Sequence, residues 1–484
     1  MSEKTIFEQS STGRGGITWP KCDVPTASIE SLLGEDVLRS ELPLPELSQI
    51  DVIRHYTRLS TTNYGVDTGF YPLGSCTMKY NPKINEEIAR IHGFADLHPY
   101  QDEATVQGIL KLLYDMQAFL AEIGGMDATT LQPSAGAQGE LTALMIFKRH
   151  HERVGESRRH IVIVPDSSHG TNPATAARCG YEVLVVASGP NGFVDLESLK
   201  SELSGEVAAF MLTNPNTLGL FEPNIIEISR LVHECGALMY CDGANMNAIL
   251  GINRPGDAGF DAMHLNLHKT FASPHGGGGP GSGPVAVKKF LEPYLPTPVV
   301  SCIDDSYLQD YDRPDSIGSL HGFYGNIGVL LRSYAYILSL GAEGLREVSE
   351  NAVLNANYLL SRISAEYDVP YGSRCMHEFV ASADRQKLHG VRAMSVAKRL
   401  IDYGFHPPTV YFPLIVSEAM MVEPTETESV EMLDSFADAM IAIAREVETD
   451  PEIVKSAPHI TEISKVDEAL AARKPVLRWN PSGE

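Results

Sequence analysis

Four short segments of the chain carry groups that could do chemistry together. The first, Gln132–Glu140, is a run of small residues that opens a predicted helix. Free backbone N–H groups and the positive end of the helix dipole could bind a phosphate there. The second segment contains His169, soon after a predicted strand, where the imidazole could stack on a planar ring. Helix packing and a local loop hydrogen bond are the ordinary structural explanations of these two patterns.

The third and fourth segments supply an aspartate and a lysine. Asp242 follows an apolar run, and its carboxylate could keep a pyridine nitrogen protonated, while Ala244 is small enough to pack on a ring face. Asp242 could equally be a turn former or a helix N-cap. Lys269 lies between apolar residues and the glycine-rich run 276–283. A partly desolvated lysine can act as a nucleophile and form a Schiff base.

Alternating strands and helices must position these groups. Short apolar runs predict strands, and longer segments with apolar residues three or four apart predict helices. This alternation predicts an α/β fold with a mainly parallel sheet, in which side chains at the carboxyl ends of the strands face a ligand crevice. The predicted strands are 161–164, 183–186, 208–212 and 237–241, and the predicted helices are 106–124, 136–151 and 225–234.

Three regions are expected along the 484 residues. Residues 1–100 are predicted to form an N-terminal arm and loops, because prolines interrupt the arm and segment 70–82 follows no regular period. Residues 101–305 would form the large domain. Residues 306–484 would form a smaller C-terminal α+β domain, with a long helix near 429–446.

Composition and charge argue against several classes of protein. The net charge is −24 and no basic patch is evident, so no nucleic-acid partner is expected. Seven scattered cysteines without a CxxC pair favour reduced thiols over disulfides or a zinc site, and no metal is expected. No apolar run reaches the roughly 18 residues of a membrane helix, and no targeting peptide is recognisable. We therefore expect a cytoplasmic protein with no membrane partner.

The order of the four segments resembles that of the fold-type I, aminotransferase-like enzymes that use pyridoxal 5'-phosphate (PLP). In this order a phosphate loop precedes the histidine, and the lysine follows the aspartate by 27 positions (269 − 242). A closer resemblance covers nearly the whole chain and is to the glycine dehydrogenase (decarboxylating) family, the P-protein of the glycine cleavage system. It is carried by YPLGSCTMKYNP (71–82), DSSHGTNPATA (166–176), TNPNTLGLFEPNI (213–225), DGANMNAILG (242–251), HLNLHKTFASPHGGGGPGSGP (264–284) and EPTETES (423–429).

The resemblance implies a role for each candidate residue. Lys269 would hold PLP as a covalent aldimine, Asp242 would face the pyridine nitrogen, and His169 would stack on the ring. Ala244 would pack against the other ring face. The other expected cofactor-binding residues are Ser134, Ala135, Gly136 and His268 around the phosphate, and Thr213 near the ring edge.

The same resemblance implies an activity and partners. The family decarboxylates glycine, releases CO2 and passes the aminomethyl group to the lipoyl arm of H-protein. The length resembles subunit 2 of the split bacterial and archaeal form, which pairs with a lysine-free subunit 1, with two copies of each expected. Arg374 is a candidate for binding the glycine carboxylate. The loops around Cys76 and His406–Pro408 are candidates for the path of the lipoyl arm.

Three other functions stay open at this point. Another fold-type I enzyme, such as a glutamate-type decarboxylase or a cysteine desulfurase, would share the four segments. A desulfurase needs a catalytic cysteine on a mobile loop, and no cysteine here lies in a recognisable loop of that kind. A scaffold subunit without chemistry is the non-enzyme alternative, and the presence of both Lys269 and Asp242 argues against it.

Overall fold

The computed structural model describes residues 3–39, 42–275, 281–320 and 322–478. The chain divides into two compact units, Phe70–His459 and Met1–Gly69 together with Ile460–Glu484. Within the described residues, no helix has the length and apolar character needed to cross a membrane.

The unit built from the two ends of the chain contains short helices joined by extended segments. Its longest helix, α3 (Gln49–Thr61), begins at the N-cap Ser48, whose side chain and that of Asp51 form a capping box. Its other helices are α1 (Ile6–Gln9), α2 (Ile29–Leu32), the 3₁₀ turn η1 (Glu35–Val37) and α16 (Glu468–Arg473).

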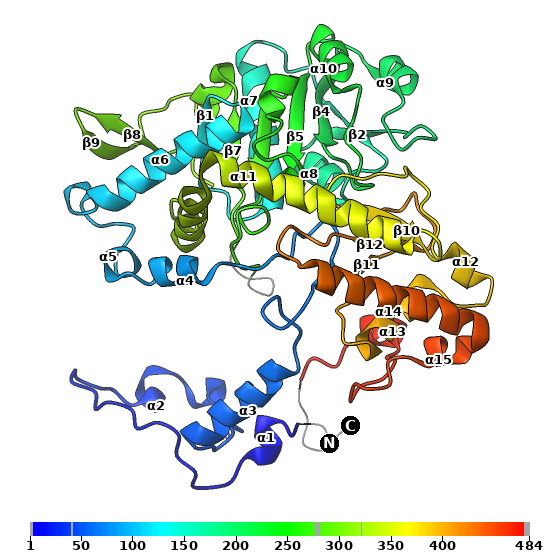
Figure 1. Ribbon diagram of the computed structural model, residues 1–484. Helices are drawn as coiled ribbons and strands as arrows, with labels where there is room; N and C mark the ends of the chain where they lie inside the picture. The colour runs from blue at the N-terminus through cyan, green and yellow to red at the C-terminus, as the bar shows by residue number, and fades with distance from the viewer. Residues whose placement is uncertain (1–2, 40–41, 276–280, 321, 479–484) are drawn as a thin grey trace. The chain divides into compact units, whose positions relative to one another are not determined.

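A seven-stranded sheet forms the centre of the Phe70–His459 unit (Figure 1), in the order β1-β7-β6-β5-β4-β2-β3. Strand β7 runs antiparallel to both of its neighbours, β1 and β6, and the other strand pairs of this sheet are parallel. The expectation of a mainly parallel sheet is therefore confirmed, and the four predicted strands correspond to β2–β5. The bounds are β1 (Ala128–Thr130), β2 (Ile161–Pro165), β3 (Glu182–Val186), β4 (Val207–Thr213), β5 (Leu238–Gly243), β6 (Ala262–Leu265) and β7 (Val285–Val287).

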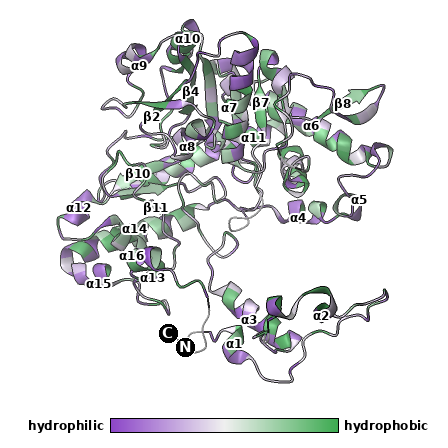
Figure 2. Ribbon diagram, turned by 180° about the vertical axis from the view of Figure 1, so that it is seen from behind, coloured by the Kyte–Doolittle hydropathy of each residue, from purple (hydrophilic) through white to green (hydrophobic). Residues whose placement is uncertain are grey.

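Helices cover both faces of this sheet because its central strands are apolar on both sides. Along β4, Phe210 and Leu212 belong to one buried cluster, whereas Ala209 and Met211 belong to another. Hydrophobic colour follows the strands in Figure 2. The first cluster includes side chains of α6 (Gln107–Gly124), α10 (Ile225–Glu234) and α11 (Ile327–Ile363). The second includes side chains of α7 (Gly136–Arg153) and α8 (Thr171–Arg178).

The three helices predicted beside the sheet are present as α6, α7 and α10. Helix α6 ends where Gly125 adopts φ 68°, a left-handed conformation that glycine tolerates without strain. Helix α7 begins at Gly136, directly after the turn that was expected to bind phosphate.

A second sheet, antiparallel and three-stranded, lies in the C-terminal part of the same unit. Strand β12 (Ala419–Val422) pairs with β10 (Phe379–Ser382) and β11 (Thr409–Val410). Helices α13 (Ala393–Asp402) and α14 (Val430–Thr449) share a separate buried cluster with it. Helix α14 matches the long helix expected near 429–446, and Ser429 caps it.

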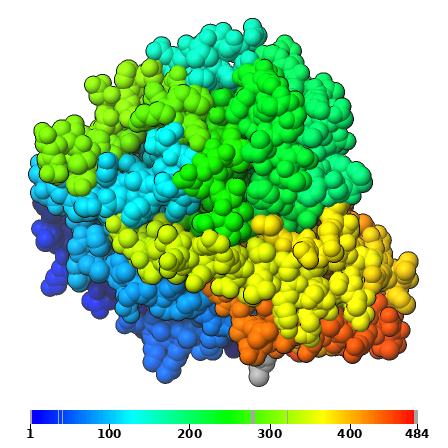
Figure 3. Space-filling model, turned by 45° about the horizontal axis from the view of Figure 1, so that its top comes forward, coloured from blue at the N-terminus to red at the C-terminus, as the bar shows by residue number. Residues whose placement is uncertain are grey.

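Helix α11 contributes to both cores. It contains a non-helical residue at Gly341, and its side chains belong to the large-sheet cluster up to Val348 and to the C-terminal cluster from Ala356. In Figure 3 yellow residues lie between the green residues of the part that contains the large sheet and the orange residues of the C-terminal part. The predicted fold class, a parallel-sheet domain with a smaller α+β part, is confirmed. The boundaries at 100 and 305 stay a prediction.

The remaining elements are short and connect these parts. They are α4 (Lys83–Ala89), α5 (His92–Ala95), η2 (Glu103–Thr105), α9 (Leu196–Glu202), η3 (Met246–Ala248), η4 (Pro255–Ala258), η5 (Lys289–Tyr294), the hairpin β8 (Val299–Ile303) and β9 (Ser306–Asp310), α12 (Asp384–Lys387) and α15 (Pro451–Ser456).

Candidate active site

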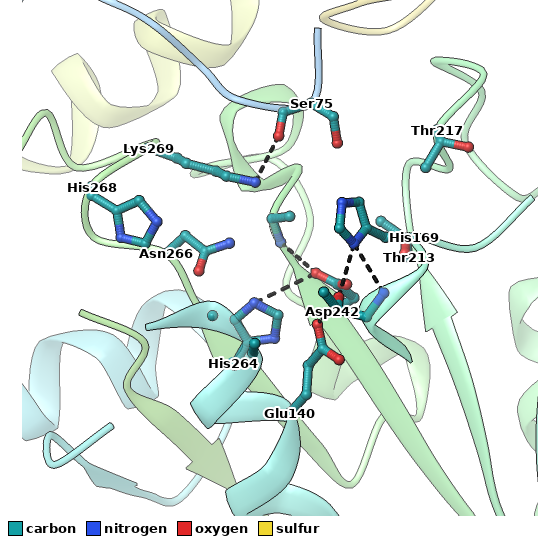
Figure 4. Close-up of a pocket in the computed structure, with 14 residues that line it drawn as sticks. Ser75, Glu140, His169, Thr213, Thr217, Asp242, His264, Asn266, His268 and Lys269 are labelled. Atoms are coloured by element: carbon teal, nitrogen blue, oxygen red, sulfur yellow. Dashed lines mark hydrogen bonds and ion pairs between the residues drawn. The ribbon is translucent and has the colours of Figure 1, made fainter. Parts of the chain in front are cut away.

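A pocket of about 180 Å³ opens where β4, β5 and β6 end and α7 begins (Figure 4). This is the carboxyl edge of the parallel strands, where ligands bind in open α/β sheets. The lining residues are Ser75, Gly136, Ala137, Glu140, His169, Thr171, Thr213, Thr217, Asp242, Ala244, His264, Asn266, His268 and Lys269. The structure thus brings together seven of the nine residues expected at the cofactor: Gly136, His169, Thr213, Asp242, Ala244, His268 and Lys269.

Ser134 and Ala135, the other two, are not among the lining residues. They form the turn into α7, where the Ser134 amide donates to Oε1 of Gln138 at 2.6 Å. Their backbone packs tightly on the end of the glycine-rich run, since a Cβ on Gly283 would approach the Ala135 carbonyl oxygen to 2.1 Å. Gly276–Pro280, the first part of that run, lie outside the described residues.

The start of α7 has the features of an anion site. Gly136 lies so close to Asn266 that a Cβ there would be 2.4 Å from Oδ1, so only glycine fits without a shift. The first N–H groups of an α-helix have no partner within the helix. Thr213 Oγ1 and Asn266 Oδ1 are also buried without a hydrogen-bond partner among the described residues. Because both residues line the pocket, these polar atoms fit a bound group such as PLP.

Asp242, at the end of β5, is buried and held in a fixed orientation. Its carboxylate accepts hydrogen bonds from Asn172 Nδ2 and from the Ala244 amide, both at 3.0 Å. His264 Nε2 lies 3.5 Å away. Burial alone would raise the pKa of Asp242, but His264, Asn172 and the more distant Lys269 together hold it below its usual value. A charged carboxylate at this position can stabilise a protonated ring nitrogen.

Glu140 is a second buried carboxyl group beneath the same pocket. Its Oε1 accepts a hydrogen bond from Thr171 Oγ1 at 2.6 Å, and that hydroxyl oxygen lies 2.8 Å from His169 Nδ1. Burial, and then the nearby charge of Asp242, raises the pKa of Glu140 to about 7. Glu140 therefore takes up a proton at near-neutral pH, while Asp242 stays charged.

His169 and His264 lie near Asp242 on different elements (Figure 4). Burial lowers the pKa of each ring. Tyr240 Oη lies 2.5 Å from His264 Nδ1, which fixes the orientation of that fully buried imidazole. His169 comes from the loop after β2 and lines the pocket, and its stacking on the cofactor stays a prediction.

Lys269 enters the pocket from the loop after β6. Its Nζ donates to the carbonyl oxygen of Ser75 at 2.7 Å, and both side chains are drawn together in Figure 4. The neighbouring Cys76 is largely buried, which raises the pKa of its thiol. His268, next to the lysine, accepts the Ser282 amide at Nδ1, and burial lowers its pKa to about 3. His268 is therefore a neutral imidazole.

The two loops suggested for the lipoyl arm contact each other. The ring of Tyr71 stacks on His406 with centroids 3.8 Å apart, and Thr409 Oγ1 donates to the Gly74 carbonyl oxygen at 2.9 Å. Arg374, the candidate for binding glycine's carboxylate, is exposed and is not among the pocket-lining residues.

Several lining residues had no predicted role. The sequence pattern places Glu140 only at the end of the small-residue segment. Its position one helical turn after Gly136 is the signal that places it under the pocket. His264 and Asn266 alternate with apolar residues at the end of β6, a pattern that also fits packing. Ser75 comes from a loop distant in sequence, and no local pattern identifies it.

Comparison with known proteins assigns the chain to a family. The family profile described as Glycine cleavage system P-protein matches residues 30–309, and the profile Glycine dehydrogenase, C-terminal domain, matches residues 348–460. A protein of Caldanaerobacter subterraneus subsp. tengcongensis is 59% identical over 98% of both chains. One of Halalkalibacterium halodurans is 59% identical over 98% of this chain and 97% of its own. Both are named "Probable glycine dehydrogenase (decarboxylating) subunit 2".

Solved structures agree on the fold. The inhibitor-bound crystal structure of a glycine decarboxylase (P-protein) of the glycine cleavage system has a TM-score of 0.73 at 22% identity, and covers 87% of this chain and 95% of its own. A glutamate decarboxylase of Lactobacillus brevis has a TM-score of 0.64 at 13% identity, and covers 90% and 98%. These likenesses establish the fold, whereas the sequence matches establish the family: the chain belongs to the P-protein family of the glycine cleavage system.

Proposed function

We propose that this chain is the PLP-bearing subunit of a glycine decarboxylase, that Lys269 holds PLP covalently, and that the aminomethyl group passes to the lipoyl arm of H-protein. The observation that carries the proposal is the meeting of Lys269, Asp242 and the start of α7 around one pocket. A nucleophilic amine, a carboxylate and an anion site are the three groups that PLP requires of its protein.

The pocket residues divide the binding of the cofactor among them. Free amides at the start of α7 and the neutral His268 would hold the phosphate. Asp242 would face the ring nitrogen, with His169 and Ala244 on the two ring faces. Thr213 Oγ1, buried and without a partner among the described residues, would bond at the ring edge.

When bound, PLP supplies an electron sink for the pair left behind as CO2 departs. Asp242 supports this by remaining charged, because Asn172 and the Ala244 amide are already directed at its oxygens. The free amine of Lys269 has an acceptor in the Ser75 carbonyl, which would hold it beside the pocket. The protein thus fixes the charge at one end of the pocket and the amine at the other.

Two partners belong to the proposal. The relatives are named as subunit 2 and are matched over 97–98% of their length, so a second subunit is implied. We infer that it lacks the lysine and that two copies of each chain assemble. The lipoyl arm would approach along the paired loops 71–79 and 406–409, and the cytoplasmic location stays a prediction.

The test is exchange of labelled bicarbonate into the carboxyl group of glycine. We expect exchange when this chain is combined with the lysine-free subunit and lipoylated H-protein, and little or none when either is left out. Full exchange by this chain alone would contradict the split-subunit part of the proposal. Turnover of glutamate or cysteine in place of glycine would favour the other fold-type I activities.

A further inference from the structure

A second group of buried acids contacts the 71–79 loop, and the proposed function does not use it. Glu378 directly precedes β10 and Glu423 directly follows β12, and the strands pair Phe379 with Val422. The two glutamates are therefore neighbours because of the antiparallel register. His377 Nε2 lies 3.9 Å from Oε1 of each, and all three side chains are fully buried.

The two carboxyl groups hold the loop through its backbone. The Ser75 amide donates to Glu378 Oε2 at 2.7 Å. Thr77 donates its amide to Glu423 Oε2 at 3.0 Å and its hydroxyl to Oε1 at 2.6 Å. Ser75 and Thr77 have φ values of 64° and 44°, which residues other than glycine seldom adopt. Such backbone persists only where surrounding contacts maintain it, and here the glutamates make those contacts.

The Ser75 residue links this acid pair to the pocket. Its N–H is bonded to Glu378, and its carbonyl oxygen accepts the amine of Lys269. We propose that Glu378 and Glu423 are positioning residues that share one proton and hold the Ser75–Thr77 loop so that the Ser75 carbonyl receives the Lys269 amine. The catalytic consequence rests on the proposed role of Lys269, whereas the loop contacts do not.

A single shared proton follows from the surroundings. Two buried carboxylates within 4.8 Å cannot both ionise without a large cost. Burial, and then Glu423, raises the pKa of Glu378 well above its usual value. Burial raises the pKa of Glu423 to about 7, against the opposing effects of the Thr77 hydrogen bonds and Lys269.

The other charged groups near the pair do not remove the need for a proton. Burial lowers the pKa of His377 to about 3, so this ring is neutral. Glu426 adds negative charge but is paired with Lys79 at 2.7 Å. Cys76 carries a thiol whose pKa burial raises, so it is neutral too. Among the described residues, the charge of Lys269 lowers the pKa of both glutamates without offsetting burial. His377 Nε2 lies 3.9 Å from Oε1 of each glutamate, which exceeds the roughly 3.4 Å between ligand atoms of a tetrahedral zinc site. The geometry therefore favours a proton over a zinc ion.

The sign of the pH dependence follows from linkage. We take opening of the loop to hydrate the two carboxyl groups and to return their pKa values toward the ordinary glutamate value. Burial under the closed loop, which outweighs the opposing hydrogen bonds from Thr77, then makes the acid pair bind the shared proton more tightly when the loop is closed. Closure is therefore favoured below the ordinary glutamate pKa and weakens as the pH rises toward and through about 7. With values of about 7 closed and 4.5 open, closure weakens about tenfold between pH 6 and pH 8.5.

Hydrogen exchange of the Ser75 and Thr77 amides in the apoprotein measures this closure directly. Protection, corrected for the intrinsic exchange rate, should fall about tenfold between pH 6 and pH 8.5. Glu423→Gln keeps an acceptor but cannot ionise, so the fall should disappear. Glu428→Gln is the matched control, because burial also raises the pKa of Glu428 to about 7 and no described hydrogen bond joins its carboxyl to the loop. It should keep the wild-type fall.

Two more variants connect the loop to its partners. Thr77→Val and Lys269→Met each remove a group that lowers the pKa of Glu423, so each should move the fall to higher pH. Thr77→Val also serves if Glu423→Gln does not fold. Three results would overturn the proposal. The first is that amide protection in the wild type does not change with pH, and the second is that its fall is unchanged in Glu423→Gln or Lys269→Met. The third is that the wild type binds a stoichiometric divalent metal ion that Glu378→Gln loses. None of these measurements needs PLP, so the proposal can fail independently of the proposed function.

Discussion

The two ends of the pocket are built in different ways. At the sheet end, Asp242 and His264 belong to strands β5 and β6, and Glu140 to helix α7, so regular elements fix them. At the loop end, Ser75 is held by Glu378 and receives Lys269, and all three lie in irregular backbone. The sheet end keeps one carboxylate charged by directing donors at it. The loop end combines two buried acids with one cation, so its state depends on pH.

Because of this difference, mutations can alter the sheet end and the loop end separately. A change at the sheet end should affect the chemistry without moving backbone, because strands and helices carry the side chains. A change at the loop end should affect backbone position first. Lys269 belongs to both ends, since it lines the pocket and bonds to the loop, and its replacement should have the largest effect.

Lys269→Ala should therefore remove both the covalent attachment and the loop contact. We expect glycine exchange to fall by more than about 10³-fold, as when a covalent catalytic group is lost. The control is Lys288→Met, which removes a partly buried lysine that donates to the Gly125 carbonyl oxygen and does not line the pocket. A Lys269→Ala variant that retains a tenth of the wild-type activity would contradict the role of Lys269 at both ends of the pocket.

Asp242→Asn tests the sheet end alone. The amide keeps the shape of the side chain but cannot support a charged ring nitrogen, so we expect kcat to fall about 10²–10³-fold. Cofactor retention, measured by absorbance, should change much less. Hydrogen exchange of the Ser75 amide should stay as in the wild type. Near-normal kcat would remove the role assigned to Asp242.

Glu140→Gln tests the raised pKa of the second carboxyl group at the sheet end. Because the pKa of Glu140 is raised to about 7, its folded form binds a proton more tightly than the unfolded chain does. The wild type should thus lose stability relative to the variant between about pH 5 and pH 8, by roughly 2–3 kcal/mol. Denaturant unfolding of the apoprotein at several pH values gives this difference. A difference that stays constant with pH would contradict the shift.

Arg374→Ala should have the smallest effect. The side chain is exposed and outside the pocket lining, so we expect KM for glycine to change by no more than about twofold. A tenfold rise in KM with kcat unchanged would instead restore Arg374 as the group that binds the carboxylate.

The contrast also explains what the sequence could predict. Strands β2–β5 were predictable because their apolar runs are short and separated by helical patterns, and Asp242 and His169 because they follow strand ends. The order of Gly136, His169, Asp242 and Lys269 then indicated the fold-type I arrangement.

The loop end could not be predicted in the same way. Contact between Ser75 and Glu378 spans 303 positions, and it depends on the register of β10 and β12. No local pattern carries that information. Arg374 is exposed and outside the pocket lining, and exposure is a property of the folded chain that a sequence pattern does not show. Ser134 and Ala135 form the turn before α7 and are not among the lining residues, and their place around the phosphate stays a prediction.

Reductive labelling of the bound cofactor tests whether Lys269 carries it. Purified protein loaded with PLP is reduced with borohydride, digested and mapped by mass spectrometry, with Lys269→Ala treated in parallel. We predict one stoichiometric label on the peptide that contains Lys269, and none on the variant. A label on Lys79 or any other lysine, or an equal label on the variant, would contradict the account.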